Sequence, residues 1–229
     1  MRENGGGVAW TTIECVILDM DGTLLDLHFD NQLWNELLPR RFAENQGLLL
    51  AQARAQIRHR LEGQRGTLPW YCLDHWSRTF GVDLPGLEAE LEHLIRPRPG
   101  ALAFLDWMVA RHIPLVLATN AHPASLSRKL AATGIAAKFR DIVSAHDLGA
   151  SKESPQFWDA LSQRVGFVPA HTLFIDDNAH VRQSARAWGV GHIYGIARPD
   201  SRGPRVDGDD CHCLEDFAEL TGNALQARG

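Results

Sequence analysis

Short apolar runs alternate with longer amphipathic stretches along most of the chain. The apolar runs are rich in Val, Ile and Leu, which indicates strands buried on both faces of a sheet. The amphipathic stretches have helical spacing and end near Gly or Pro. The predicted strands are Glu14–Leu18, Pro114–Thr119, Asp141–Ser144, Thr172–Asp176 and His192–Tyr194, and the helices between them are Ala101–His112, Ala124–Thr133, Ser154–Val165 and Ala179–Trp188. This alternation predicts an α/β fold, a Rossmann-like parallel sheet with helices on both faces.

The pattern changes after the first predicted strand, where helical periodicity continues without a convincing strand. The candidate helices in this part are Asn31–Asn45, Leu48–Leu61, Pro69–Phe80 and Leu87–Ile95. We therefore expect a small all-helical cap domain, residues 29–96, inserted into a core domain formed by residues 1–28 and 97–229. Such a cap can cover a site at the carboxyl edge of the sheet, where open α/β sheets bind ligands. Residues 197–211, rich in Gly, Pro and Asp, are predicted to form a mobile surface loop.

Composition and charge narrow the choice of partners. The 229 residues are 45% hydrophobic and 22% charged, and the net charge is -5 with no long basic run, which argues against nucleic acid as a partner. No apolar run is long enough to span a bilayer, and the N-terminal residues lack a signal-peptide pattern, so we expect no membrane partner. Cysteines at 15, 72, 211 and 213 are too few for a secreted disulfide scaffold, which favours a cytoplasmic, reduced protein.

The segment Cys211-His212-Cys213 has the residue types of a zinc site. A structural zinc site needs a second Cys/His pair at a suitable spacing, and the chain offers none. A metal at this segment is therefore the less favoured interpretation. The oligomeric state is left open by the sequence.

Two acids, Asp19 and Asp21, follow the first predicted strand with one residue between them. If the alternation of the strand continues, both carboxylates enter the same space. Like charges so close together are costly without a cation nearby, and a set of oxygen ligands favours Mg²⁺. Gly22 then permits a backbone conformation that other residues resist. The alternative is a simple turn, in which Asp and Gly are both common.

Three later features resemble parts of a phosphate site. Another apolar strand ends in Asp176 and Asp177, and the strand before Thr119 and Asn120 delivers a hydroxyl and an amide that can bond a phosphate oxygen. Lys152 lies just before a predicted helix, where its ammonium can neutralise a carboxylate and a phosphate. Each feature alone has an ordinary explanation as a strand end, a helix cap or a surface lysine. In this order they predict a catalytic site.

The ordered set resembles the haloacid dehalogenase-like (HAD) superfamily, whose four motifs occur in the same order. They are here Leu18-Asp19-Met20-Asp21-Gly22-Thr23, then Leu117-Ala118-Thr119-Asn120, then Lys152, then Phe174-Ile175-Asp176-Asp177-Asn178. The helical insert lies where this superfamily places its type-1 cap. The resemblance covers the whole predicted α/β part.

The resemblance implies a phosphatase that uses an aspartyl-phosphate intermediate. Asp19 would be the nucleophile, and Asp21 would protonate the leaving oxygen and then activate water. Thr119 and Lys152 would hold the phosphoryl group. Mg²⁺ would bind the Asp19 carboxylate, the Asp21 backbone carbonyl and Asp176.

The same resemblance gives Asp177 a supporting role, in which it orders the waters of the metal or Lys152. Dehalogenases lack an acid at the position of Asp21, because a halide leaves without a proton. The presence of Asp21 therefore favours phosphoryl transfer. Phosphomutases keep this acid too, so hydrolysis rests on analogy.

Four segments are also similar to bacterial GMP/IMP nucleotidases: Asp19–Leu27, Trp70–Ser77, Thr119–Pro123 and Thr172–Asp177. This similarity implies a purine nucleoside 5'-monophosphate as the substrate. Trp70, Tyr71 and Trp76 can offer a stacking face for the base, with Trp34 and Phe29 in the same cleft, although such aromatics can equally form the core of the cap. The arginines Arg54, Arg58 and Arg60 are expected on a solvated face, with the alternative that one of them reaches a phosphate or a ribose. The alternatives are a phosphatase of sugar phosphates or other small phosphomonoesters, a phosphomutase, and an inactive binding module.

Overall fold

The computed structural model describes residues 8–206, 208 and 211–221. Within these residues, six strands form one sheet in the order β3-β2-β1-β4-β5-β6, and every neighbouring pair is parallel. The strands are β1 (Cys15–Leu18), β2 (Leu115–Thr119), β3 (Asp141–Ser144), β4 (Thr172–Ile175), β5 (His192–Ile196) and β6 (Cys213–Leu214). The predicted α/β fold with a parallel sheet is confirmed.

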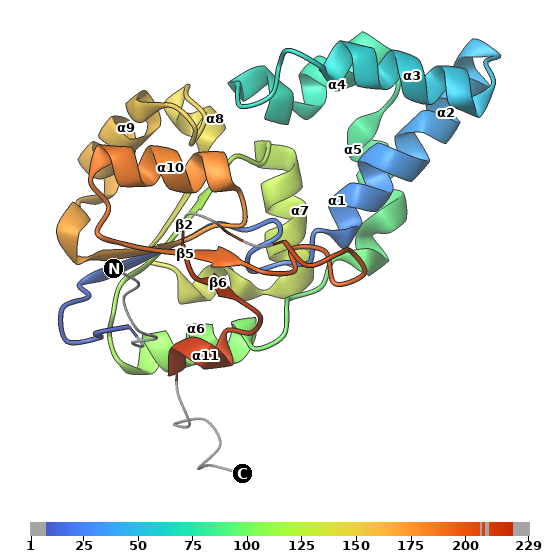
Figure 1. Cartoon of the computed structure of the whole chain (residues 1–229). Helices are drawn as coiled ribbons and strands as arrows, with labels where there is room; N and C mark the ends of the chain where they lie inside the picture. Colours follow the sequence, from blue (N-terminus) through green and yellow to red (C-terminus); the bar gives the residue numbers. More distant parts are fainter. Residues whose placement is uncertain (1–7, 207, 209–210, 222–229) are drawn as a thin grey trace.

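Helices cover both faces of the sheet (Figure 1). On one face lie α6 (Ala101–Ala110), α7 (Pro123–Thr133) and α11 (Ala218–Thr221), and on the other α8 (Ala145–Leu148), α9 (Pro155–Val165) and α10 (Ala179–Trp188). Two 3₁₀ turns, Ile135–Lys138 and Pro169–His171, connect these elements. Along β1, Val16 and Leu18 join the α6 side, whereas Cys15 and Ile17 join the α9 side. This double burial explains why the strands are continuous apolar runs.

The helical insert (residues 28–94) has a hydrophobic cluster of its own, in which Phe42, Trp76, Phe80 and Leu84 are buried together. Helices α2 to α4 lie away from the sheet, and α1 and α5 lie closer to it (Figure 1). The insert consists of α1 (His28–Gln32), a π-helical turn (Leu33–Leu37), α2 (Leu38–Gln46), α3 (Leu50–Leu61), a 3₁₀ turn (Leu68–Tyr71), α4 (Leu73–Phe80), α5 (Leu84–Leu91) and a second 3₁₀ turn (Glu92–Leu94).

The prediction of a single helix over Pro69–Phe80 is wrong for the first residues of that range, which form a separate turn. Cys72 has an extended backbone (φ -89, ψ 107), and its sulfur accepts a hydrogen bond from the backbone N–H of His75 at 3.4 Å. This cap starts α4 at Leu73 and leaves the preceding residues in a separate 3₁₀ turn. Trp70 and Tyr71 therefore lie on a connection between helices rather than on the helix that carries Trp76.

The segment after β5 is an irregular and mostly exposed stretch over its described part, as predicted for a surface loop. Its mobility stays a prediction, and residues 207, 209 and 210 lie outside the described residues. Asp200 Oδ2 accepts a hydrogen bond from Asn31 Nδ2 at 2.7 Å, and the Ser201 N–H donates to Asp26 Oδ1 at 3.0 Å. These bonds fasten the segment to the start of the helical insert. The sequence did not predict β6, because its partner strand precedes it by a long irregular stretch.

The Cys211-His212-Cys213 segment forms no metal group among the described residues. Cys213 belongs to β6, and His212 Nε2 lies 3.2 Å from Glu219 Oε2. In the same described part of the chain, no helix is both long and apolar enough to cross a membrane.

Candidate active site

Three polar residues lie next to one another at the carboxyl edge of the sheet. Strand β1 lies between β2 and β4, and Leu18 is paired in register with Leu117 and with Ile175. The residues that follow are therefore neighbours in space as well. Thr119 is the last residue of β2, and Asp19 and Asp176 directly follow β1 and β4. Asp19, Thr119 and Asp176 are 5%, 1% and 1% exposed.

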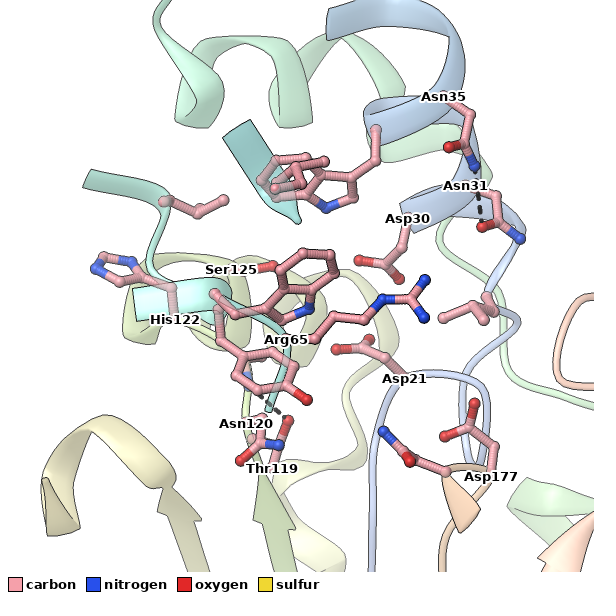
Figure 2. A pocket seen from close by; sticks show the side chains of 18 of the residues that line it. Asp21, Asp30, Asn31, Asn35, Arg65, Thr119, Asn120, His122, Ser125 and Asp177 are labelled. Carbon is pink, nitrogen blue, oxygen red and sulfur yellow. Dashed lines mark hydrogen bonds between the residues drawn. The ribbon is translucent and has the colours of Figure 1, made fainter. Parts of the chain in front are cut away.

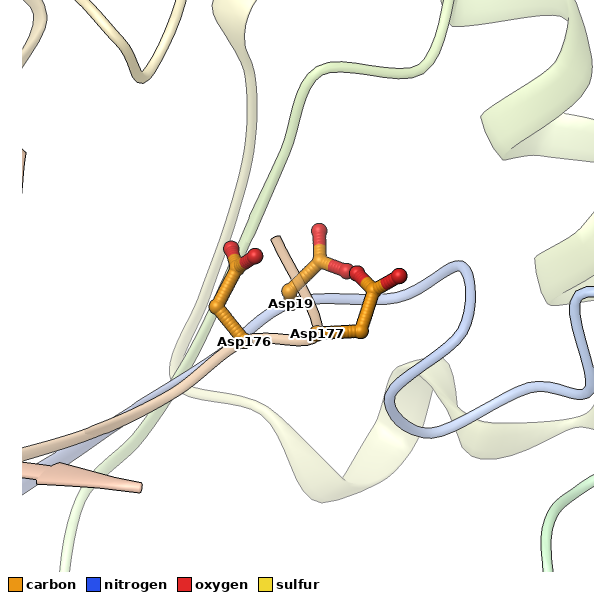
Figure 3. Close-up of side chains that lie close together, drawn as sticks. All are labelled: Asp19, Asp176 and Asp177. Atoms are coloured by element: carbon orange, nitrogen blue, oxygen red, sulfur yellow. The ribbon is translucent and has the colours of Figure 1, made fainter. Parts of the chain in front are cut away.

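The carboxylates of Asp19, Asp176 and Asp177 form one cluster at this edge (Figure 3). Each offers an oxygen, and these oxygens lie within 4.8 Å of one another. Three acids so close together repel one another unless cations compensate them. Oxygen ligands at this spacing fit Mg²⁺. Asp177 was predicted only to support the site, but the structure brings its carboxylate into the cluster itself, whereas the side chain of Asp21 is not part of it.

Gly22 holds the turn that carries the first two acids. Its φ is +78°, and a Cβ at this position would lie 2.6 Å from Asp177 Oδ2. Any other residue would collide with a carboxylate of the cluster and adopt a strained backbone. Thr23 Oγ1 accepts a hydrogen bond from the Asp177 N–H at 3.1 Å and links the two acidic loops.

Lys152 provides the positive charge next to the cluster. It is buried, and its ammonium contacts Asp19 Oδ1 and donates to Asp176 Oδ2 at 2.7 Å. Its backbone N–H donates to Asn120 Oδ1 at 2.9 Å, and Asn120 Nδ2 donates to Glu153 Oε2 at 3.1 Å. The Asn120 amide, predicted to bind phosphate, thus fixes the loop that carries Lys152. Thr119 Oγ1 accepts from the Ala121 N–H at 3.0 Å, which leaves its own hydrogen to donate.

The protonation of the cluster follows from its burial. Burial raises the pKa of Asp19 to about 7; Lys152 opposes this rise and Asp176 adds to it. Burial raises the pKa of Asp177 well above its usual range, with further increases from Asp176 and Asp19. Burial lowers the pKa of Lys152, but Asp176 and Asp19 raise it more, so the ammonium stays charged. A bound divalent cation would lower the pKa of the acids again.

A cavity of about 1130 Å³ opens above the cluster, between the sheet edge and the helical insert (Figure 2). Asp19, Thr119, Asn120, Lys152 and Asp176 line its floor. The residues of the helical insert that line it include Asp30, Asn31, Trp34, Arg65, Trp70 and Tyr71.

Not all the predicted aromatic residues reach the cavity. Trp76 is 0% exposed and stacks on Phe80, with ring centroids 5.4 Å apart, so of the two alternatives it belongs to the core of the insert and offers no face to a base. It packs inside the helical insert because α4 directs it toward α2 and α5. Trp70, Tyr71 and Trp34 do line the cavity.

Sequence reasoning missed several polar residues of the site. The buried Lys129 of α7 donates to Asp21 Oδ1 and to Asp30 Oδ1, both at 2.7 Å. The Tyr71 hydroxyl donates to Glu153 Oε1 at 2.5 Å. A lysine in an amphipathic helix and a glutamate beside another motif residue carry no signal that distinguishes them from surface residues.

The arginines of the helical insert divide between its surface and the cavity. Arg60 does not line the cavity, and its Nη1 donates to the Thr79 carbonyl at 2.9 Å. Arg54 and Arg58 are exposed as predicted but also line the cavity, where Arg54 pairs with Glu36 at 2.9 Å. Arg65, which the sequence did not single out, extends into the cavity (Figure 2), with its guanidinium 5.7 Å from the Trp70 ring centroid. Its charge is available to a ligand between the insert and the sheet edge.

Comparisons with known proteins agree with this geometry. Residues 13–189 match the model of the haloacid dehalogenase-like hydrolase family. The chain is 36% identical over 194 residues to the GMP/IMP nucleotidase YrfG of Escherichia coli K12, covering 85% of this chain and 87% of that protein. It is 23% identical over 199 residues to a phosphorylated carbohydrates phosphatase of Thermotoga maritima, covering 80% and 85%.

The fold is also that of solved HAD structures. The crystal structure of a HAD phosphatase from Thermococcus onnurineus superimposes with a TM-score of 0.76 at 19% identity, covering 93% of this chain and 98% of that one. At this identity the likeness shows the fold alone. The family match and the 36% identical relative confirm the resemblance drawn from the four motifs, and with it an enzyme of the hydrolase class. The chain belongs to the haloacid dehalogenase-like hydrolase family.

Proposed function

We propose that the protein is a Mg²⁺-dependent phosphomonoester hydrolase that attacks its substrate with Asp19, and that the substrate is a purine nucleoside 5'-monophosphate such as GMP or IMP. The observation that carries this proposal is the cluster of Asp19, Asp176 and Asp177 beside the Lys152 ammonium, on the floor of a large cavity. Such a site attracts both a divalent cation and a phosphate.

The residues of the chain divide the reaction between them. An Asp19 carboxylate oxygen attacks the phosphorus and forms an aspartyl-phosphate, while Lys152 and the Thr119 hydroxyl neutralise the phosphoryl oxygens. Asp21 gives its proton to the leaving oxygen of the alcohol. In the second half, the same carboxylate takes a proton from the water that attacks the phosphorus. The Asp19 carboxylate is then released together with inorganic phosphate.

The metal ion belongs to this proposal as well. The carboxylates of Asp19 and Asp176 and the backbone carbonyl of Asp21 would hold it, and Asp177 would bind it directly or order its waters. When bound, Mg²⁺ supplies positive charge that lets the Asp19 carboxylate approach a phosphate dianion. The short distances within the carboxylate cluster support this assignment.

Two observations support a purine nucleotide. The relative with 36% identity over most of both chains is a GMP/IMP nucleotidase. The cavity is large, and it offers the aromatic rings of Trp34, Trp70 and Tyr71 for a base, together with the carboxyl group of Asp30 and the guanidinium of Arg65 for polar groups of the nucleotide.

Phosphate release from a panel of substrates in the presence of Mg²⁺ tests the proposal. We expect GMP and IMP to be hydrolysed with a higher kcat/KM than pyrimidine nucleotides and sugar phosphates. A clear preference for sugar phosphates, on which the more distant T. maritima relative acts according to its name, would overturn the nucleotide assignment. Isomerised product without free phosphate would indicate a phosphomutase, and no turnover of any substrate would indicate an inactive binding module.

A cytoplasmic location and the absence of nucleic-acid and membrane partners complete the proposal. Cys15, Cys72 and Cys213 carry free thiols, which suits a reducing compartment. Localisation of the tagged protein by cell fractionation tests this part independently of the activity.

A further inference from the structure

One buried ammonium joins the helical insert to the core loop that carries Asp21. The Lys129 side chain is 2% exposed and projects from α7. Its Nζ donates to Asp21 Oδ1 and to Asp30 Oδ1, each at 2.7 Å. Asp21 follows β1 of the sheet, whereas Asp30 belongs to α1 of the insert. The lysine therefore connects three elements that are distant in the sequence.

The surroundings of Lys129 keep it charged and fixed. Burial lowers the pKa of Lys129, but Asp21 and Asp30 raise it more. The ring of Phe29 lies 4.8 Å from Nζ, a distance at which an aromatic face attracts a cation. The carboxylate of Glu88 is also buried nearby; burial raises its pKa, and Lys129 is among the groups that lower it. A neutral side chain at this position would leave several acids facing one another without compensation.

The contact with Lys129 determines which oxygen of Asp21 is available. Because the ammonium occupies Oδ1, a proton to be transferred is carried on Oδ2. Asp30 provides the second anchor, since its Oδ1 also binds the ammonium while its Oδ2 is shielded from solvent and has no hydrogen-bond partner among the described residues. Figure 2 shows Asp21 and Asp30 entering the same cavity from the core and from the insert.

We propose that Lys129 is a positioning residue that orients Asp21 for proton transfer to the leaving oxygen, and that Asp30 ties this orientation to the docked helical insert. The proposal rests on the proposed function, because it assigns a partner to the acid of that reaction. Lys129 itself exchanges no proton and touches no substrate atom in this role. It differs from Lys152, whose ammonium contacts Asp19 and Asp176.

A comparison of two leaving groups tests the proposal in the Lys129→Met variant. The alcohol released from GMP needs a proton, whereas p-nitrophenolate leaves without one. We expect the first step with GMP, measured in single turnover, to slow by roughly 100-fold, because general acid catalysis supplies a factor of that order. The burst of p-nitrophenolate should slow by no more than about threefold, and KM for GMP should change by less than about twofold.

Three further variants complete the design. Lys138→Met is the matched control, because Lys138 is partly exposed and pairs with Asp106 outside the site; both rates should equal those of the wild type. Lys129→Arg keeps the charge and two donors and should restore most of the GMP rate. Asp30→Asn keeps Oδ1 as an acceptor but removes the charge. The rate of the first step with GMP should therefore fall selectively in this variant too, but by a smaller factor than in Lys129→Met.

Equal slowing of both substrates in Lys129→Met with an unchanged melting temperature would overturn the proposal and indicate a general structural role. If Lys129→Met does not fold, the same two rates are measured in Asp30→Asn. A loss of rate with GMP alone supports the proposal, and an equal loss of rate with both substrates refutes it. Failure of the proposed function is distinguishable, because the wild type itself would then fail to release phosphate from GMP, whatever its rate with the p-nitrophenyl ester.

Discussion

The sheet edge and the helical insert line the same cavity, but their residues are fixed in different ways. At the sheet edge, the order of the parallel strands places Asp19 between the ends of β2 and β4, which carry Thr119 and Asp176, and all three are buried. The insert presents Trp70 from a 3₁₀ turn and Arg65 from an exposed connection. The edge thus has a geometry set by the whole sheet, whereas the insert depends on a few contacts with the core. This difference suggests that chemistry resides in the edge and substrate selection in the insert.

The largest expected effect comes from Asp19→Asn, which breaks the edge. The amide keeps the shape of the side chain but is no nucleophile and is a weaker metal ligand, so kcat should fall by about four orders of magnitude. Steady-state phosphate release from GMP measures the loss. Asp106→Asn, which alters an exposed acid paired with Lys138, is the control and should retain full activity. Near-normal turnover by Asp19→Asn would refute the covalent mechanism.

The next prediction concerns metal binding to the edge at different pH values. Chelation by EDTA should abolish activity, and Mg²⁺ should restore it. Because burial raises the pKa of Asp19 to about 7, protons compete with Mg²⁺ at pH 6 but hardly at pH 8. Affinity should weaken by about tenfold for each pH unit below 7 if one proton is displaced. The Mg²⁺-induced rise in melting temperature should therefore be larger at pH 8 than at pH 6.

The metal-free protein should show the opposite trend. Acids with a raised pKa bind more protons in the folded than in the unfolded chain between about pH 4 and 7. Their contribution to the free energy of unfolding is therefore present at low pH and is lost as the pH rises through 7. Thermal unfolding with EDTA across this range measures the trend, and an increase in this contribution with pH would contradict the raised pKa.

The difference between the two regions also explains what the sequence could predict. The residues at the strand ends were predictable, because parallel strands bring their carboxyl ends together and the apolar runs mark where each strand stops. Asp19, Thr119 and Asp176 meet for this reason. Helix α10 likewise has the predicted limits, Ala179 and Trp188, because Asn178 caps its start and Gly189 follows its end.

The contacts between insert and core could not be predicted in this way. Lys129 reaches Asp21 and Asp30 only because α7 packs beside the insert, and no local pattern reports such packing. The orientation of Trp76 depends in the same way on where α4 begins. That start is set by Cys72, whose side chain caps the helix. Periodicity identifies elements, but it does not say which polar groups meet when separate elements dock.

A smaller effect is expected when the insert loses a base-stacking ring. Trp70→Ala should raise KM for GMP by about tenfold, since stacking on an aromatic side chain is worth about 1–3 kcal/mol per base. Ribose 5-phosphate has no base, so its KM should not change. Steady-state kinetics with both substrates gives the comparison. Leu49→Ala, an exposed position of the insert, is the control. An equal increase in KM for both substrates would assign Trp70 to the structure of the insert.

The smallest effect should come from the contact that docks the insert on the core. Burial raises the pKa of Tyr71, and Glu153 raises it further, so the hydroxyl keeps its proton and donates to Glu153 Oε1. Tyr71→Phe removes this bond but keeps the ring in the cavity. A hydrogen bond to a charged group contributes about 1.5–3 kcal/mol. The half-buried Glu153 still accepts a hydrogen bond from Asn120 in the variant, so its carboxylate keeps a partner and the loss should be smaller. We therefore expect KM for GMP to rise by only about threefold.

This variant also sharpens the division between edge and insert. The rate of the first chemical step, measured with saturating GMP in single turnover, should stay within about twofold of the wild type if Tyr71 only docks the insert. Thr79→Val removes a hydroxyl of the insert that bonds to the His75 carbonyl at 2.8 Å, and it serves as the control for the loss of one hydrogen bond within the insert. A large fall in the chemical step in Tyr71→Phe alone would show that the insert acts on the reacting groups through Glu153 and the neighbouring Lys152.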